Sequence, residues 1–295
     1  MKILITGLTG FIGKNFYRHT KYRENIFAVS TKSSINKNFH SRNINYLDCN
    51  LENIDNFKDE IKKFDPDCIL NFAWGGIPNY SQDISNNNLK IILNFFNFLE
   101  KNTNIKKFIN TGTCAEYFNP SGIVSENYTV KPYDHFSSAK ITLSRVLEER
   151  CAKLNINYVN LRLFYVFGLN QRKKSLIPFL IDSYKNGTET KLSNPFSKLD
   201  YIYAEDVIDA IDSCIKINIP SGSYNVGRGE SVSNYEIQKI ISGKLNLKFN
   251  DDIYPSEKDE IDFYADINKL NSAVGWSPKF QIHEGIQKIL EEIIY

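Results

Sequence analysis

Short apolar runs alternate with longer amphipathic stretches along the first half of the chain. The apolar runs predict strands at residues 2–6, 26–30, 45–47, 67–72, 107–110 and 158–164. Helices are predicted between them, at residues 11–22, 53–63, 83–101 and 137–154. Strands separated by helices of this length indicate βαβ units and a parallel sheet. Because such crossovers are right-handed, the sequence predicts an α/β fold with a doubly wound parallel sheet.

The rhythm of strands and helices loosens after about residue 165. Turn-forming residues become frequent there, at Asn170, Pro178, Gly187, Asn194 and Pro220. We therefore expect the second half of the chain to carry a smaller, insertion-like region that binds a substrate.

The composition is that of a globular protein, with 42% apolar and 24% charged residues. The 36 Lys and Arg nearly balance the 34 Asp and Glu, and a net charge of +2 argues against a nucleic-acid-binding protein. No apolar run approaches the roughly 18 residues of a membrane span, and the N-terminus has no signal-peptide pattern, so we expect a cytoplasmic location. The five Cys lack a C-x-x-C pair and the four His are scattered, so neither a disulfide framework nor a metal site is expected.

A glycine motif follows the first predicted strand and opens the first predicted helix. A turn at this place needs positive φ, and a bound pyrophosphate needs close backbone approach, both of which glycine permits. The free N–H groups and the positive dipole end of the helix favour a phosphate. The motif therefore predicts a dinucleotide site. Its expected contacts are Gly7, Thr9, Gly10, Phe11, Ile12 and Gly13.

The end of the second predicted strand bears on the choice of dinucleotide. A site for NAD usually has Asp or Glu there to bind the ribose hydroxyls. This chain has Ser30, Thr31 and Lys32, with no acid. Hydroxyls and a lysine can bind a 2′-phosphate, which a carboxylate would repel, so we predict NADP(H).

Motifs typical of one protein family are spread over nearly the whole chain. They are Thr6–Gly13, Pro66–Ala73, Asn88, Thr111–Tyr117, Leu161–Gly168, Asp200–Val207, Tyr224–Gly227 and Val274–Pro278. Together they resemble the extended short-chain dehydrogenase/reductase family, which contains NAD(P)-dependent nucleotide-sugar epimerases, dehydratases and reductases. The resemblance implies a Rossmann-type fold in which residues 1–168 and about 200–230 bind the dinucleotide. Residues of about 169–199 and 231–295 would then bind a nucleoside-diphosphate sugar.

The resemblance also implies a homodimer in which the helices at 83–101 and 137–154 pair with their copies. Apolar side chains on these helices are candidates to fill that interface. They are Leu89, Ile92, Leu93, Phe96, Val146 and Leu147.

Catalysis in such enzymes depends on a Ser/Thr, a Tyr and a Lys. The Tyr exchanges a proton with the sugar oxygen, and the Lys holds the nicotinamide ribose and lowers the pKa of the Tyr. Thr113 and Lys140 match two of these positions, but Phe136 stands where the Tyr is expected, one helical turn before Lys140. Three interpretations remain open: a Tyr→Phe replacement introduced into the gene, a catalytically inactive member, or an acid relocated to Tyr133, His135 or Cys114.

The residues after Thr113 limit which reactions of the family this chain could catalyse. The family's 4,6-dehydratases have an Asp-Glu pair there, because removing a proton at C5 and a hydroxyl at C6 needs a carboxylate acid and base. This chain has Cys114 and Ala115, so a dehydratase is not expected. Glu116 is expected to cap a helix or form a salt bridge, with a catalytic role as the alternative. With NADP(H) predicted, reduction of the 4-keto group of a nucleoside-diphosphate-linked deoxyhexose is favoured. A nucleotide-sugar 4-epimerase and a non-catalytic NADP-binding protein remain alternatives.

The resemblance implies further contacts. For the dinucleotide they are Asn50, Leu51, Phe72, Ala73, Trp74, Thr111 and Lys140. For the nucleotide sugar they are Thr113, Cys114, Tyr165, Leu176, Ile177, Lys198, Arg228 and Lys258. The two Arg with which the family often clamps the pyrophosphate are missing, and Lys198 and Lys258 could replace them only as point charges.

Overall fold

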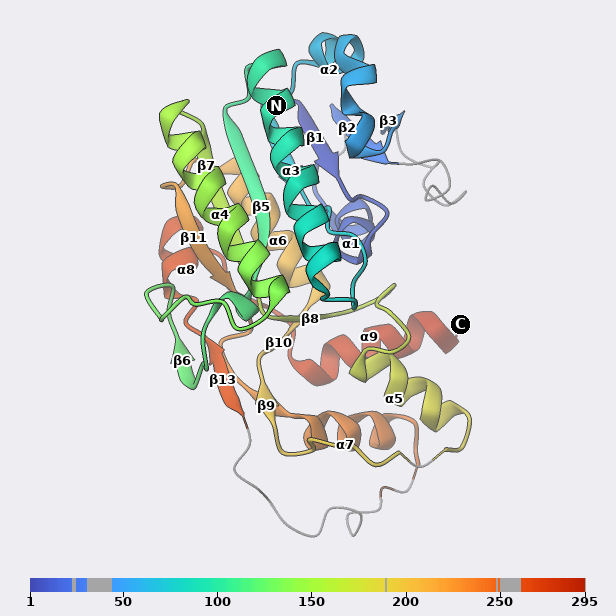
Figure 1. Ribbon diagram of the computed structural model, residues 1–295. Helices are drawn as coiled ribbons and strands as arrows, with labels where there is room; N and C mark the ends of the chain where they lie inside the picture. The colour runs from blue at the N-terminus through green and yellow to red at the C-terminus, as the bar shows by residue number, and fades with distance from the viewer. Residues whose placement is uncertain (23–24, 31–43, 189, 248, 250–260, 295) are drawn as a thin grey trace. The chain divides into compact units, whose positions relative to one another are not determined.

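The chain is divided into two compact units in the computed structural model, which describes residues 1–22, 25–30, 44–188, 190–247, 249 and 261–294 (Figure 1). The first unit contains residues 1–118, 129–162 and 208–224, and the second contains residues 119–128, 163–207 and 225–295. Three of the predicted contacts, Thr31, Lys32 and Lys258, lie outside the described residues.

Seven strands form the main sheet, in the order β11-β7-β5-β4-β1-β2-β3. Their bounds are β1 Ile3–Thr6, β2 Ile26–Ser30, β3 Asn45–Asp48, β4 Cys68–Asn71, β5 Lys107–Thr113, β7 Asn157–Leu163 and β11 Gly222–Val226. β1 pairs in parallel with β2 and with β4, and the β2–β3 and β4–β5 pairs are parallel as well. The predicted doubly wound parallel sheet is confirmed, and β5 continues beyond its predicted end to Thr113.

Helices cover both faces of this sheet. Their bounds are α1 Phe11–His19, α2 Lys58–Phe64, α3 Gln82–Asn102, α4 His135–Lys153 and α6 Ala204–Lys216. α3 and α4 lie side by side over one face, and α6 lies behind the sheet (Figure 1). α1 lies beside α6, because the Thr20 hydroxyl donates to Asp212 Oδ1 at 2.6 Å and the Lys21 N–H donates to Asp212 Oδ2 at 2.7 Å.

Two helices differ from their predicted extents. α1 ends at His19 rather than at residue 22, because Thr20 adopts φ −57° and ψ 144° and turns its hydroxyl to Asp212. The stretch at 53–63 forms a 3₁₀ helix, η3 (Leu51–Phe57), with a kink at Asn53 (φ −112°, ψ 22°), and then α2. Phe57, with non-helical φ and ψ of −119° and 26°, separates the two.

A buried apolar cluster joins α3 and α4 to the sheet. It includes Ile92, Phe95 and Phe96 of α3 and Leu143 and Leu147 of α4, packed against strand residues such as Phe108. Ile92, Phe96 and Leu147 were expected to fill a dimer interface, and that expectation was wrong because the chain's own sheet covers them. Leu89 and Leu93 are partly buried and pack against the same cluster, and Val146 is also partly buried.

A row of buried polar side chains crosses five adjacent strands of the sheet. The Thr6 hydroxyl donates to Asn71 at 2.7 Å, Asn71 to Asn110 at 2.9 Å, Asn110 to Asn160 at 2.9 Å, and Asn160 to Ser223 at 3.3 Å. Each amide donates to one neighbour and accepts from the other, so no buried amide in the row lacks a partner. The row ties together the strands whose C-terminal ends carry the candidate site.

The second unit is built from shorter elements. β6 (Gly122–Val124), β9 (Lys198–Leu199), β12 (Val232–Ser233) and β13 (Asp262–Ala265) form one small sheet, and β8 (Tyr165–Phe167) pairs in parallel with β10 (Tyr201–Tyr203). Its helices are α5 Leu176–Lys185, α7 Asn234–Lys244, α8 Asn268–Val274 and α9 Ile282–Ile294. Side chains of α5, α7, α9 and the β8–β10 pair share a separate apolar cluster.

No helix in the described part of the chain is long and apolar enough to span a membrane. All five Cys are buried, and none of them forms a disulfide. Among the described residues there is no group of three or more His, Cys, Asp or Glu placed to hold a metal ion.

Candidate active site

The glycine motif forms a tight turn between β1 and α1. Gly7 has φ +73°, and a Cβ there would come within 2.6 Å of the Ala73 nitrogen and the Phe72 carbonyl carbon. A Cβ on Gly13 would come within 2.4 Å of the Gly7 oxygen, and the Gly10 N–H donates to that oxygen at 3.0 Å. The motif therefore needs glycine at Gly7 for conformation and at Gly13 for close packing of helix on strand.

The start of α1 fits an anionic ligand. No side chain caps it, and its first internal bond runs from Lys14 N to Gly10 O. The amides of the first turn and the positive end of the helix dipole suit a pyrophosphate. Ser30 ends β2, and its hydroxyl lies 3.4 Å from the hydroxyl of Thr9. These observations agree with a dinucleotide placed along the carboxyl ends of β1 and β2.

The other predicted dinucleotide contacts follow neighbouring strands at the same edge. Asn50 caps η3 by accepting from the Glu52 N–H, and Leu51 begins that helix directly after β3. The Phe72 N–H donates to Thr6 O at 3.1 Å, which places Phe72–Trp74 directly after β4. Thr111 lies on β5 and its hydroxyl donates to Asn71 O at 3.0 Å.

Lys140 is buried on α4 and reaches the end of β5. Its Nζ donates to Thr111 O at 2.9 Å and lies 4.1 Å from the centre of the Trp74 ring. The pKa of Lys140 is lowered to about 8. Burial of the ammonium lowers it, and the charge of Glu116 partly opposes this effect. The ammonium therefore stays protonated at neutral pH, with donors left for a ligand beyond Thr111.

Phe136 lies one turn before Lys140 and is 9% exposed. Its ring packs edge-on against Trp74, with 5.6 Å between ring centres, and at a tilt of 45° against Tyr80, with 4.8 Å between ring centres. The Lys140 Nζ is 6.0 Å from the centre of the Phe136 ring. The slot where a tyrosine was expected is thus an apolar aromatic surface. Tyr80 was missed in the sequence because a loop brings it there and no local pattern marks it.

The proton donors considered as replacements differ in environment. Tyr133 is 57% exposed, and its pKa is raised first by burial of the hydroxyl and then by the Asp134 charge. His135 is exposed at the start of α4, and Cys114 is buried. Asp134 and Ser137 cap α4 reciprocally, with the Ser137 N–H donating to Asp134 Oδ1 at 2.6 Å.

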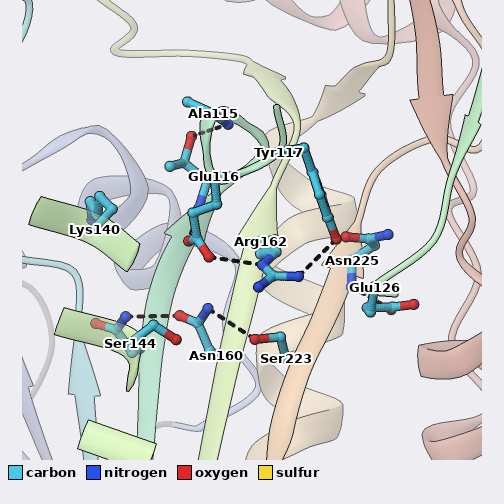
Figure 2. A network of polar contacts seen from close by, with 12 residues as sticks. Ala115, Glu116, Tyr117, Glu126, Lys140, Ser144, Asn160, Arg162, Ser223 and Asn225 are labelled. Atoms are coloured by element: carbon cyan, nitrogen blue, oxygen red, sulfur yellow. Dashed lines mark hydrogen bonds and ion pairs between the residues drawn. The ribbon is translucent and has the colours of Figure 1, made fainter. Parts of the chain in front are cut away.

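Thr113 lies at the end of β5 in a hydrogen-bonded turn. Its Oγ1 accepts the Ala115 N–H at 3.2 Å, and its N–H donates to Glu116 Oε1 at 3.0 Å. Glu116 Oε2 in turn accepts from Arg162 Nε at 2.8 Å. Figure 2 marks this contact with a dashed line. The expected roles of Glu116, as a cap and as a salt-bridge partner, are both confirmed.

The predicted sugar contacts of the second unit lie on separate elements. Leu176 and Ile177 begin α5. Tyr165 is 38% exposed on β8. Lys198 lies 3.9 Å from Asp262, and both side chains are half exposed.

Arg228 is held at the base of a loop. Its N–H and that of Gly229 donate to the buried Asp200, which also accepts from the Ala265 N–H. Its guanidinium lies 3.3 Å from Glu230, and its buried Nε has no partner among the described residues. Burial raises the pKa of Asp200 to about 6, whereas the three backbone donors and the Arg228 charge lower it.

Comparison with known proteins agrees with this arrangement. The profile of the NAD dependent epimerase/dehydratase family matches residues 3–227. The dTDP-4-dehydro-6-deoxyglucose reductase of Escherichia coli is 24% identical, over 99% of this chain and 97% of its own. The CDP-abequose synthase of Yersinia pseudotuberculosis is 30% identical over 72% of each. The solved structure of a UDP-glucose 4-epimerase of Thermotoga maritima superposes with a TM-score of 0.85 at 20% identity, over 100% of this chain and 99% of that one.

The chain therefore belongs to the NAD dependent epimerase/dehydratase family, within the extended short-chain dehydrogenases/reductases that act on nucleotide sugars. It is an NAD(P)-dependent oxidoreductase, with a nicotinamide dinucleotide as its cofactor.

Proposed function

We propose that the protein reduces the 4-keto group of a nucleoside-diphosphate-linked deoxyhexose with NADPH, a step in making surface polysaccharide sugars. The observation that carries the proposal is that Lys140 donates to Thr111 O on β5, the strand that ends at Thr113, while Cys114 and Ala115 after it carry no carboxylate. Reduction needs a hydroxyl and a cation there, whereas loss of water across C5 and C6 needs an acid and a base. The named activities of the two curated relatives support a reductase or synthase of a deoxysugar.

The dinucleotide would be held by the Gly7–Gly13 turn, the start of α1 and Lys140. When bound, it supplies the hydride. The preference for NADP rests on Ser30 at the end of β2, followed by Thr31 and Lys32 instead of an acid.

Thr113 would bind the sugar oxygen at C4. Its Oγ1 already accepts from Ala115 N, so its hydroxyl proton is available for donation to a substrate oxygen. Lys140 would hold the ribose and supply positive charge near the developing alkoxide. Phe136 offers no proton, so turnover with this residue depends on another donor. The hydroxyl of Tyr80, whose ring contacts Phe136, is a further candidate beside Tyr133, His135 and Cys114.

Arg228 is the stronger candidate for the sugar pyrophosphate. Its buried Nε lacks a partner among the described residues, whereas Lys198 is half exposed beside Asp262. We expect Arg228→Lys to raise KM for the nucleotide sugar, because a lysine cannot bind a phosphate through two parallel donors.

A non-catalytic NADP-binding protein is the second candidate, and Phe136 is the observation that favours it. It would keep the glycine turn and Lys140 without needing a proton donor. Incubation of the protein with NADPH and a panel of nucleoside-diphosphate 4-keto-6-deoxyhexoses distinguishes the two candidate functions. Consumption of NADPH with formation of a reduced sugar supports the reductase. Tight NADPH binding without turnover of any sugar supports the binding protein, and interconversion of 4-hydroxyl epimers with bound NAD would support the epimerase.

A further inference from the structure

Glu116 is a fully buried carboxylate beside the candidate catalytic residues. Its exposed fraction is 0%, and a buried charge is tolerated only when it is paired and hydrogen-bonded. One oxygen accepts from Arg162 Nε at 2.8 Å, and the other accepts from the Thr113 N–H at 3.0 Å. Both oxygens therefore have a defined donor.

Arg162, the partner of Glu116, is also buried and has a second hydrogen-bond partner. It lies on β7 and is 7% exposed. Its Nη1 donates to the Tyr117 hydroxyl at 3.1 Å, and its guanidinium lies 4.8 Å from the centre of the Tyr117 ring. Figure 2 shows the Glu116 carboxylate pointing toward Arg162, with Lys140 on the opposite side. The pair thus connects β7 to the turn that follows β5.

We propose that Glu116 is a positioning residue of the active site, which fixes the Thr113 backbone and supplies the negative charge that Lys140 faces. The role of Thr113 in this inference rests on the proposed function. The role toward Lys140 rests only on the buried groups of the first unit and needs no substrate.

The position of Thr113 depends on the carboxylate through the backbone. The Glu116 side chain accepts from Thr113 N, and Thr113 Oγ1 accepts from Ala115 N, so the turn is closed from both sides. A carboxylate offers two acceptor oxygens, whereas a glutamine amide offers one. Glutamine at this position would give its oxygen either to Arg162 or to Thr113, and would leave the other donor unpaired.

The charge of Lys140 depends on few groups. Its Nζ meets the Thr111 carbonyl of β5, the Trp74 ring after β4 and the Phe136 ring of α4. Among the described residues, Glu116 is the charged group that acts on it, and it opposes the lowering of the pKa caused by burial. Arg162 faces Glu116 from the other side, and the Tyr117 hydroxyl accepts from Arg162. Removing the Glu116 charge should therefore let the pKa of Lys140 fall below its present value of about 8.

Fluorescence of Trp74 can measure this directly, because its ring lies 4.1 Å from Lys140 Nζ and an indole responds to a charge so close. A pH titration should show a step near pH 8 that Lys140→Met abolishes, which assigns the step. In Glu116→Gln the midpoint should move to lower pH. It should stay in place in Glu116→Asp, which keeps the charge, and in Glu149→Gln, a matched control that removes an exposed carboxylate on α4. An unmoved midpoint in Glu116→Gln would overturn the electrostatic role.

Turnover tests the positioning role. Aspartate is one methylene shorter and cannot reach both Arg162 and Thr113, so Glu116→Asp should lower kcat roughly 10- to 100-fold, with KM for NADPH little changed. The double variant Glu116→Gln/Arg162→Gln leaves no unpaired charge, and its kcat should fall similarly if the single glutamine variant does not fold. Unchanged kcat in a folded Glu116→Asp would overturn the positioning role. A shifted Trp74 midpoint with no turnover by any form would support the Glu116 assignment and contradict the reductase instead.

Discussion

Single residues determine the chemistry around Lys140, where α4 meets β5. Phe136, Trp74 and Tyr80 form an aromatic contact over Lys140 that no pattern in the sequence predicts, since the loop after β4 brings two of them there. By contrast, Thr113 and Lys140 could be predicted, because each stands at a fixed place in a recognisable motif. The cap and salt bridge of Glu116 were also predictable in kind, but its two partners, Thr113 and Arg162, required the folded chain.

The affinity for NADPH should depend on pH through Lys140. Its pKa is about 8, so the ammonium is charged below this value and loses its proton as pH rises through it. Binding should therefore weaken from neutral to alkaline pH, which calorimetry can follow. In Lys140→Met the affinity should be lower and this pH dependence should disappear. An identical profile in both proteins would contradict the role of Lys140.

Lys32 should select the dinucleotide. Replacing it by Asp exchanges the positive charge that could bind a 2′-phosphate for a negative one that would repel it, so Lys32→Asp should weaken NADPH binding far more than NADH binding. Calorimetric titration of both dinucleotides measures the difference. Tighter binding of NADH than of NADPH by the unchanged protein would show that the prediction of NADP(H) is wrong.

At the level of elements, hydrophobic periodicity predicted the strands of the main sheet except β11, and the helices α3 and α4, within a few residues. It did not predict the break at Asn53 or the end of α1 at His19. The break comes from the non-helical backbone of Asn53, and the end of α1 involves Thr20, which donates to Asp212 far along the chain. Periodicity reports neither. The row from Thr6 through Asn71, Asn110 and Asn160 was not predicted either, because it joins residues on different strands.

Gly112 on β5 should be indispensable for the turn that follows it. A Cβ there would lie 2.6 Å from Glu116 Oε1 and 2.9 Å from the Asn160 amide. We expect Gly112→Ala to displace Glu116, lower kcat and reduce the free energy of unfolding by roughly 1–3 kcal/mol. Gly243→Ala on α7 is the matched control, because its Cβ would meet nothing within 4 Å, and thermal unfolding should show no loss of stability. Equal stability of the two variants would contradict the packing argument.

At the level of the whole molecule, the sequence predicted the class of fold. It did not predict which helix residues pack on the sheet and which remain for a second copy of the chain. An apolar stripe on α3 serves equally for packing on a sheet and for pairing with a second copy. Ile92, Phe96 and Leu147 proved to be core residues. The arrangement of the second unit was predicted only as a smaller region, since its short strands pair across long stretches of sequence.

We still expect a homodimer through α3 and α4, with Leu93 and Val146 among the partly buried side chains left to it. Light scattering should give about twice the chain mass of 34.1 kDa. Val146→Glu should shift the protein toward the monomer, because a carboxylate would be buried in an apolar interface. Leu247→Glu, at an exposed position of the second unit, should leave the mass unchanged. A monomer mass for the unchanged protein at micromolar concentration would rule out the dimer.

The most direct test of the reductase is a comparison of Phe136 and Phe136→Tyr in the oxidation of NADPH by a nucleoside-diphosphate 4-keto-6-deoxyhexose. A hydroxyl at this position would lie one turn from Lys140, whose charge would lower the pKa of the phenol, and a placed acid contributes roughly 10²–10⁴-fold in rate. We predict that both forms bind NADPH alike and that the tyrosine form turns over faster by about that factor. Equal turnover would mean that the proton comes from elsewhere, and Tyr80→Phe and Tyr133→Phe would then locate it. No reduction of any such sugar by either form would contradict the assignment as a 4-ketoreductase.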